Sequence, residues 1–212
     1  MQVTGSSSGF GRSMTELLLK NGNRVVATLR RKEARWSSQL TGVFTKAKEV
    51  FGRVDAVFNN AGIGIITKME SLSYEEAHMV FEANSWDASN VTREAIRMLR
   101  EVNKPIWGIL LQDSSTLGLH ALGGFSESIA QELDPAWNIK VTIIEPGPFR
   151  TRVFADNLQP ELAGTKLREG VISSLPNGDA EKAVAAIEKR KRQSLAETMD
   201  RYGSWSEDVY FT

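Results

Sequence analysis

The stretch Thr4-Gly5-Ser6-Ser7-Ser8-Gly9-Phe10-Gly11 decides the fold of this chain. A short apolar start precedes it, and residues 12–19 follow it with apolar side chains at helical spacing. A strand is predicted at residues 24–28, so the glycines lie between a strand and a helix, with a second strand close behind. This arrangement is typical of a phosphate-binding turn, in which N–H groups at the start of the helix face an anion.

The three glycines have separate expected roles in such a turn. Gly5 permits the tight turn, Gly9 lets the backbone approach a pyrophosphate, and Gly11 lets the helix pack close to the strand. Their spacing, G-x-x-x-G-x-G, differs from the dinucleotide fingerprint G-x-G-x-x-G. Taken alone, a run of serines and glycines is also compatible with an ordinary flexible turn.

Length and composition predict a single domain over residues 1–212 and argue against several kinds of partner. Basic and acidic residues number 26 each, so no charge excess favours nucleic acid or an anionic membrane. Without cysteine and with only 2 histidines, the chain is expected to hold neither a disulfide framework nor a metal site. No signal peptide is evident and the apolar runs are too short to span a bilayer, so we expect a cytoplasmic protein.

The end of the second predicted strand bears on the choice of cofactor. In a dinucleotide-binding fold this point meets the adenosine ribose, where an acid favours a free 2′-hydroxyl and an arginine favours a 2′-phosphate. Arg30 and Arg31 stand here without an acid, so NADP(H) is preferred and NAD(H) is the alternative. A solvated basic pair that opens a loop is the other interpretation.

Turn and loop signals follow each later predicted strand. The strand at 53–58 ends in Asn59-Asn60-Ala61-Gly62, the strand at 106–112 in Asp113-Ser114-Ser115-Thr116, and the strand at 139–144 in residues 145–151. Helices are predicted at 43–52, from a capping box at Ser73 to about Arg100 with a break near Asn84-Ser85, and at 125–133 after two glycines.

Four of these stretches, in this order, resemble the motifs of the short-chain dehydrogenase/reductase family: residues 4–11, 59–62, 114–115 and 146–151. The resemblance covers nearly the whole chain. It implies an α/β fold, a Rossmann-like doubly wound parallel sheet between two layers of helices, with an edge strand missing. It also implies hydride transfer between a nicotinamide and a small-molecule carbonyl or alcohol substrate. A homo-oligomer is compatible with the family.

The same resemblance assigns roles to single residues. Asn59 would brace the central strand, Ser115 would hold the substrate oxygen, and Asn84 would hold a proton-relay water. Residues 152–178 would form a substrate lid. The cofactor-binding residues would be Gly5, Ser7, Ser8, Gly9, Phe10, Gly11, Arg30, Asn60, Ala61, Gly62, Pro146, Gly147 and Thr151. As alternatives, paired serines after a strand are common loop chemistry, and a mid-helix Asn is most often a surface residue.

The motif that carries the proton chemistry of the family is missing. The family uses Tyr-x-x-x-Lys on the helix after the serine, where the ammonium lowers the pKa of the tyrosine. The tyrosines of this chain, Tyr74, Tyr202 and Tyr210, have no lysine four positions on, and none follows Ser115 at the expected distance. We therefore expect reduction of carbonyls at or near the background rate.

Compared with the family pattern, stretches are missing in at least three places: at the start of the first strand, at a third strand expected between residues 32 and 42, and around residue 122. The match is good on both sides of each, as if whole segments had been dropped by splicing, a misjudged coding boundary or trimming. Besides an oxidoreductase, the sequence therefore admits a non-catalytic NADP(H)-binding or interaction protein, or an incomplete splice or gene-model product.

Overall fold

A parallel sheet is the centre of the computed structural model, which describes residues 1–28, 36–65, 67, 69–114 and 120–146. Its strands run in the order β2-β1-β3-β4-β5, and every neighbouring pair is parallel. The strands are β1 (Gln2–Val3), β2 (Val26–Ala27), β3 (Ala56–Asn59), β4 (Gly108–Asp113) and β5 (Ile139–Ile144). Because the chain moves outward from β1 first toward β2 and then toward β3, the order reverses between β1 and β3, where such sheets bind ligands.

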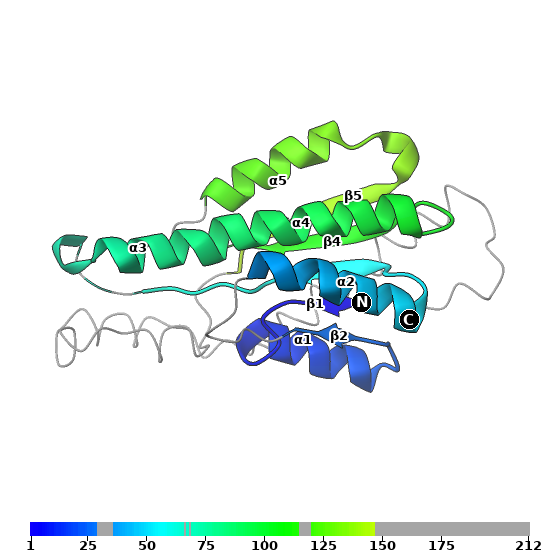
Figure 1. Cartoon of the computed structure of the whole chain (residues 1–212), viewed down its shortest axis with the longest axis horizontal. Coiled ribbons are helices and arrows are strands. Elements are labelled where there is room, and N and C mark those ends of the chain that lie inside the picture. The colour runs from blue at the N-terminus through cyan, green and yellow to red at the C-terminus, as the bar shows by residue number, and fades with distance from the viewer. Residues whose placement is uncertain (29–35, 66, 68, 115–119, 147–212) are drawn as a thin grey trace.

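Five α-helices lie in the described part of the chain: α1 (Gly9–Lys20), α2 (Trp36–Phe51), α3 (Tyr74–Phe81), α4 (Ala88–Arg97) and α5 (His120–Glu132). Figure 1 shows α3 and α4 as one long rod. A π-helical segment, η2 (Glu82–Asp87), joins them, and a second π-helical segment, η3 (Met98–Val102), ends the rod. No helix in the described ranges combines the length and apolar character needed to cross a bilayer.

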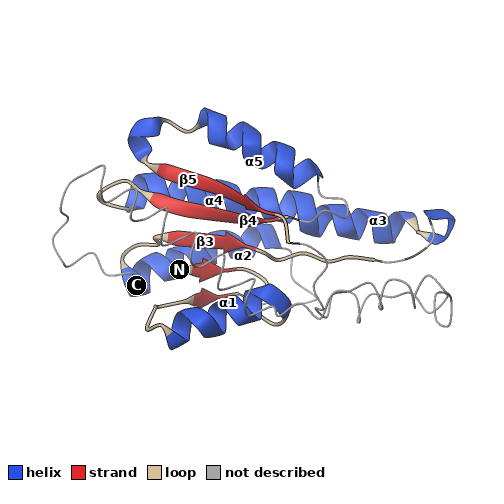
Figure 2. Ribbon diagram, turned by 180° about the vertical axis from the view of Figure 1, so that it is seen from behind, coloured by secondary structure: helices blue, strands red, loops and turns tan. Residues whose placement is uncertain are grey.

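Two apolar clusters, one on each face of the sheet, make the fold a three-layer α/β sandwich. On one face Met14 and Leu18 of α1 pack against alternate strand residues such as Phe58 and Leu111. On the other face the clustered residues of α2, α4 and the strands include Phe44, Ala47, Val91, Ala95, Val57 and Leu110. The view from behind in Figure 2 shows the strands with α1 on the near side. The expected doubly wound fold is therefore present.

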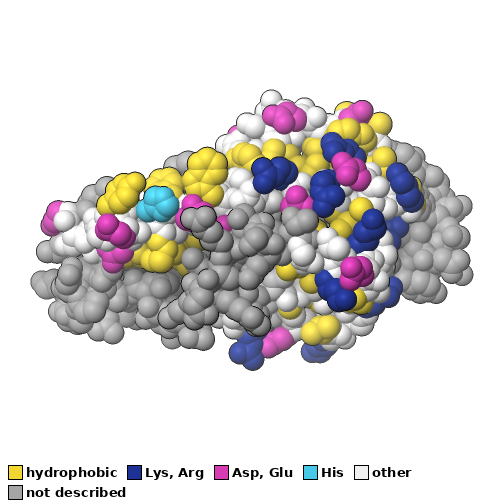
Figure 3. All heavy atoms as spheres, in the orientation of Figure 1, with side chains coloured by type: hydrophobic (Ala, Val, Ile, Leu, Met, Phe, Trp, Pro, Cys, Tyr) yellow, Lys and Arg dark blue, Asp and Glu magenta, His cyan; other side chains and the backbone are white. Residues whose placement is uncertain are grey.

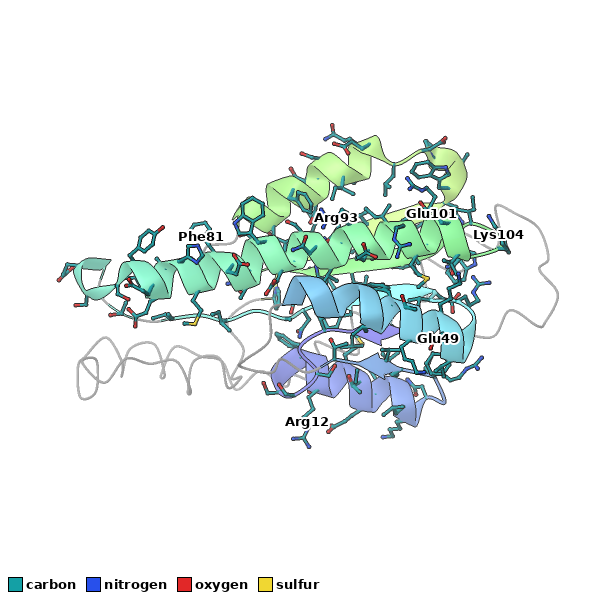
Figure 4. The ribbon with its side chains drawn as sticks, in the orientation of Figure 1. Arg12, Glu49, Phe81, Arg93, Glu101 and Lys104 are labelled. Atoms are coloured by element: carbon teal, nitrogen blue, oxygen red, sulfur yellow. The ribbon has the colours of Figure 1, made fainter. Side chains whose placement is uncertain are left out.

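Charged side chains are kept to the outside of the helices. Figure 4 labels Arg12, Glu49 and Glu101, and each is exposed. Figure 3 shows hydrophobic side chains along α3 as well. The large exposed ones on α3 and the turn after it are Tyr74, Met79, Phe81 and Trp86.

Several predicted elements differ from the observed ones. The pair Gly123–Gly124 lies inside α5 and not before it, because Leu122 and Ser126 face the core on either side of the glycines and hold them in helical backbone. The chain does not break at Asn84 but stays helical through η2. Helix α2 begins at Trp36, seven residues earlier than predicted from the stripe that starts at Val43. In the described sheet β2 is the edge strand, in agreement with the missing third strand.

Candidate cofactor and active site

The glycine loop connects β1 to α1 at the carboxyl end of the sheet. Gly5 has φ +68° and Gly9 has φ +55°, a backbone region that side chains other than glycine rarely adopt. Ser6 ties the loop to the strands, because its Oγ donates to the Val3 carbonyl at 3.0 Å and its N–H donates to the Thr28 carbonyl at 3.1 Å. The loop is thus a built turn and not a flexible one.

Gly11 is where the start of α1 presses against this turn. A Cβ built on Gly11 would meet the Gly5 carbonyl oxygen and would lie 2.6 Å from Nδ2 of Asn60. Glycine is therefore required at position 11 by space alone. The close approach expected there exists, and it joins the helix to the turn and to the loop after β3.

The loop after β3 is fastened to the loop after β1 through Thr4. The Thr4 carbonyl accepts a hydrogen bond from Asn60 Nδ2 at 2.8 Å, and Thr4 Oγ1 accepts from the N–H groups of Asn60 and Ala61, each at 2.9 Å. The Asn60 amide is thus engaged with the protein. Gly62, next in the chain, is exposed.

Asn59 lies in a buried polar network below this loop. Its Nδ2 donates to Gln112 Oε1 at 2.8 Å and to the Ala88 carbonyl at 2.9 Å, and Gln112 Nε2 donates to Thr92 Oγ1 at 2.6 Å. These bonds connect β3, β4 and α4. Asn59 therefore makes bracing contacts of the kind that the family resemblance implies.

Asn84 is buried, so its interpretation as a surface residue is wrong. It is 6% exposed in the wide turn η2, its Nδ2 donates to the Ile63 carbonyl at 2.7 Å, and its Oδ1 accepts from the Ile63 N–H at 2.9 Å. A single side chain thus holds the far end of the β3 loop. Wide helical turns of this kind are frequent at functional sites.

The carboxyl end of β4 carries two buried polar groups. Asp113 Oδ1 and Ser114 Oγ are shielded from solvent and have no hydrogen-bond partner in the described ranges. Burial raises the pKa of Asp113 to about 8. The Ser114 N–H donates to the Ile144 carbonyl at 2.7 Å, which holds the ends of β4 and β5 together.

Sequence reasoning passed over Asp113, although the strand pattern holds a signal for it. In a strand every second side chain shares a face, so Asp113 shares a face with Ile109 and Leu111. Both of these are buried in the cluster beneath α1. An acid that continues such a row is a candidate for a perturbed carboxyl group.

The other predicted site residues lie around the same edge or outside the described ranges. Ser7 is exposed, Phe10 packs against the α1 cluster, and Pro146 follows β5. The Ser8 side chain makes no capping bond and the first turn of α1 holds no acid, so neither competes with an anion there. Outside the described residues lie Arg30, Ser115, Gly147, Thr151 and the predicted lid at 152–178. Within the described ranges, no group of His, Cys, Asp and Glu is suited to a metal ion.

Comparison with known proteins gives consistent relatives. A family model described as short chain dehydrogenase matches residues 34–162, a range that begins after the glycine loop. An uncharacterized oxidoreductase of Schizosaccharomyces pombe is 34% identical over an alignment of 185 residues, and the match covers 74% of this chain and 63% of that protein. An oxidoreductase of Penicillium decumbens is 29% identical over an alignment of 184 residues, and the match covers 70% of this chain and 60% of that protein. The chain thus spans less than two thirds of the length of both.

Solved structures show the same fold. A short-chain dehydrogenase from Streptomyces avermitilis superposes with a TM-score of 0.71 at 29% identity, covering 88% of this chain and 82% of that one. A 3-ketoacyl-(acyl-carrier-protein) reductase from Brucella melitensis, solved in complex with NADH, superposes with a TM-score of 0.74 at 23% identity, covering 92% and 91%. At that identity the second likeness concerns the fold alone.

Proposed function

Since the chain belongs to the short-chain dehydrogenase family, we propose that it is an NADP(H)-dependent oxidoreductase acting on a small-molecule carbonyl or secondary alcohol. The observation that carries this proposal is the glycine loop at the point between β1 and β3 where the strand order reverses. There the glycine loop has left-handed backbone at Gly5 and Gly9, and Gly11 leaves no room for a side chain. A turn with bare backbone at Gly5 and Gly9 suits a ligand that approaches the backbone, as a pyrophosphate does.

The predicted cofactor-binding residues would follow a dinucleotide in order. The start of α1 would face the pyrophosphate, because a helix amino terminus favours negative charge. Ala61 and Gly62 would line the adjacent ribose with backbone, while Pro146, Gly147 and Thr151 would hold the carboxamide. When bound, a nicotinamide supplies or accepts the hydride at the substrate carbon. Arg30, three residues after β2 in the sequence, supports the preference for NADP(H), since an arginine after this strand would match a 2′-phosphate.

The missing Tyr-x-x-x-Lys pair favours a second candidate, a protein that holds NADP(H) without turnover. Both candidates require binding, so the first measurement is a fluorescence titration of NADPH and of NADH with the full chain. We expect saturable binding with tighter affinity for NADPH. Failure of both nucleotides to bind would rule out both candidates, whereas binding without turnover would leave the second.

A further inference from the structure

The Asp113 carboxyl group differs in its partners from that of Asp55, a buried acid near the strands. Asp55, just ahead of β3, is paired with Arg53 at 2.6 Å. The Oδ1 atom of Asp113 is enclosed and has no hydrogen-bond partner among the described residues. The residue as a whole is half-buried, and it is the last residue of β4.

The position of β4 in the sheet puts this carboxyl group near the reacting end of a dinucleotide. β4 lies two strands from β1, and parallel neighbours are about 4.8 Å apart, so the end of β4 is roughly 10 Å from the glycine loop. A dinucleotide whose pyrophosphate lies at that loop extends across the carboxyl ends of the strands. Its nicotinamide half would thus lie toward β3 and β4, where Asp113 ends its strand.

The protonation state of Asp113 suits a donor. Burial alone raises its pKa to about 8, and no charged group of the described residues contributes to the shift. The side chains clustered on this face of the sheet are apolar, among them Leu111 and Ile144, and the next acid after β5, Glu145, is exposed. At neutral pH the carboxyl group is therefore uncharged and carries a proton. An enclosed carboxylic acid of this kind serves as a general acid in other enzymes.

We propose that Asp113 protonates the substrate oxygen during carbonyl reduction, a role that the family gives to its tyrosine. This inference rests on the proposed function. The carbonyl carbon receives a hydride with its electron pair from the reduced nicotinamide, and the π electrons of the C=O bond move to oxygen. That oxygen forms its O–H bond with the Asp113 proton while the carboxyl O–H bond breaks. The carbonyl is reduced, the nicotinamide is oxidised, and the Asp113 carboxylate regains a proton from water.

The first test compares Asp113→Asn with the full parent chain in single turnovers of NADPH with ethyl benzoylformate. Asparagine keeps the shape of the side chain, but its amide N–H groups are too weakly acidic to transfer a proton to the substrate. With Asp113 as the donor, the parent should exceed the background rate expected from the missing tyrosine, and Asp113→Asn should lose about 10²- to 10⁴-fold in rate with unchanged NADPH affinity. The parent rate should fall above pH 8, near the pKa of about 8, and Asp113→Glu should recover part of the loss. The matched control Glu145→Gln removes an exposed acid at the neighbouring strand end and should change neither quantity.

A second readout does not depend on turnover. In protein labelled with ¹³C at aspartate carboxyl carbons, the signal absent from Asp113→Asn should titrate near pH 8. A midpoint near the ordinary aspartate value of about 4 would overturn the inference. So would an unchanged rate in Asp113→Asn, or a parent that binds NADPH yet reduces the ketoester no faster than buffer. Absence of NADPH binding would instead overturn the proposed function, and the inference with it.

Discussion

Gly11 and Gly123 provide a matched pair for testing the glycine loop. A methyl group on Gly11 would meet the Gly5 carbonyl and the Asn60 amide, whereas nothing lies within 4 Å of a Cβ on Gly123 inside α5. Gly11→Ala should cost about 1–3 kcal/mol of unfolding free energy through overpacking and should weaken NADPH binding. Gly123→Ala should add about 0.5–1 kcal/mol. Urea unfolding measures both, and equal effects would show that the loop is not tightly packed.

Arg30 is the residue on which the cofactor preference rests. A charge-assisted hydrogen bond to a 2′-phosphate is worth about 1.5–3 kcal/mol. Arg30→Ala should thus raise the Kd of NADPH by about 10- to 150-fold and leave that of NADH nearly unchanged. The two titrations are controls for each other. Parallel losses for both nucleotides would mean that Arg30 does not read the 2′ position.

The rod of α3, η2 and α4 depends on Asn84 for its attachment to the β3 loop. Asn84→Ala removes both partners of the Ile63 backbone and should cost about 1–3 kcal/mol. Asn90→Ala on the same rod is the control, since Asn90 bonds only the side chain of exposed Arg93, and its effect should stay within about 0.5 kcal/mol. Chemical denaturation of the two variants gives the comparison. A cost for Asn84→Ala no larger than that of the control would show that the loop holds without it.

The elements that could be predicted from the sequence are those specified by local pattern. The β-branched run Ile139–Ile144 is β5 to the residue, and Ser73 with Glu76 forms the predicted capping box at the start of α3. Gly123 was predicted to precede a helix because glycine is a weak helix former, yet core contacts on either side override that propensity.

The candidate site was predictable only in part, for a physical reason. The glycine turn and the Asn59–Gly62 turn are local in sequence, so their residue types indicate their positions. Asn84 is bonded to a residue 21 positions away in the chain, and the strand row that Asp113 continues, Ile109 and Leu111, packs against a helix that starts at Gly9. The contact between Asn84 and Ile63 has no signature in the local spacing of residues. Asp113 could have been found by carrying the two-residue period of β4 one step further.

Stability of the folded chain should depend on pH through Asp113. Its pKa is about 8 in the folded state and about 3.9 when unfolded, so between these values the folded state binds the extra proton. Below pH 4 the carboxyl group is neutral in both states, and its contribution to stability is fully present. Between pH 4 and 8 it is ionised in the unfolded state but still neutral in the folded state, so this contribution is lost as the pH rises through 8. The free energy of unfolding should therefore fall between pH 4 and 8, by up to about 1.4 kcal/mol per pH unit from this group.

Asp113→Asn isolates this effect in urea unfolding at pH 5, 7 and 9. The variant lacks the titrating carboxyl group, so its advantage over the parent should grow with pH. A constant difference between the two proteins over that range would show that Asp113 titrates at its ordinary pKa.

Thr4 accepts hydrogen bonds from Asn60 and Ala61 at the beginning of residues 60–63, and Asn84 accepts one from the Ile63 N–H at their end. Residues 60–63 are therefore attached by hydrogen bonds at both ends, to Thr4 beside the glycine loop and to Asn84 between α3 and α4. A ligand that binds at the glycine loop and rigidifies the backbone near Thr4 should reduce the motion of residues 60–63. This includes the motion of Ile63, which the ligand would not contact. Hydrogen exchange of the Ile63 amide, which is bonded to Asn84 Oδ1, should slow when NADPH is added. Exchange at an unaltered rate, with NADPH bound, would mean that the two ends of residues 60–63 fluctuate independently.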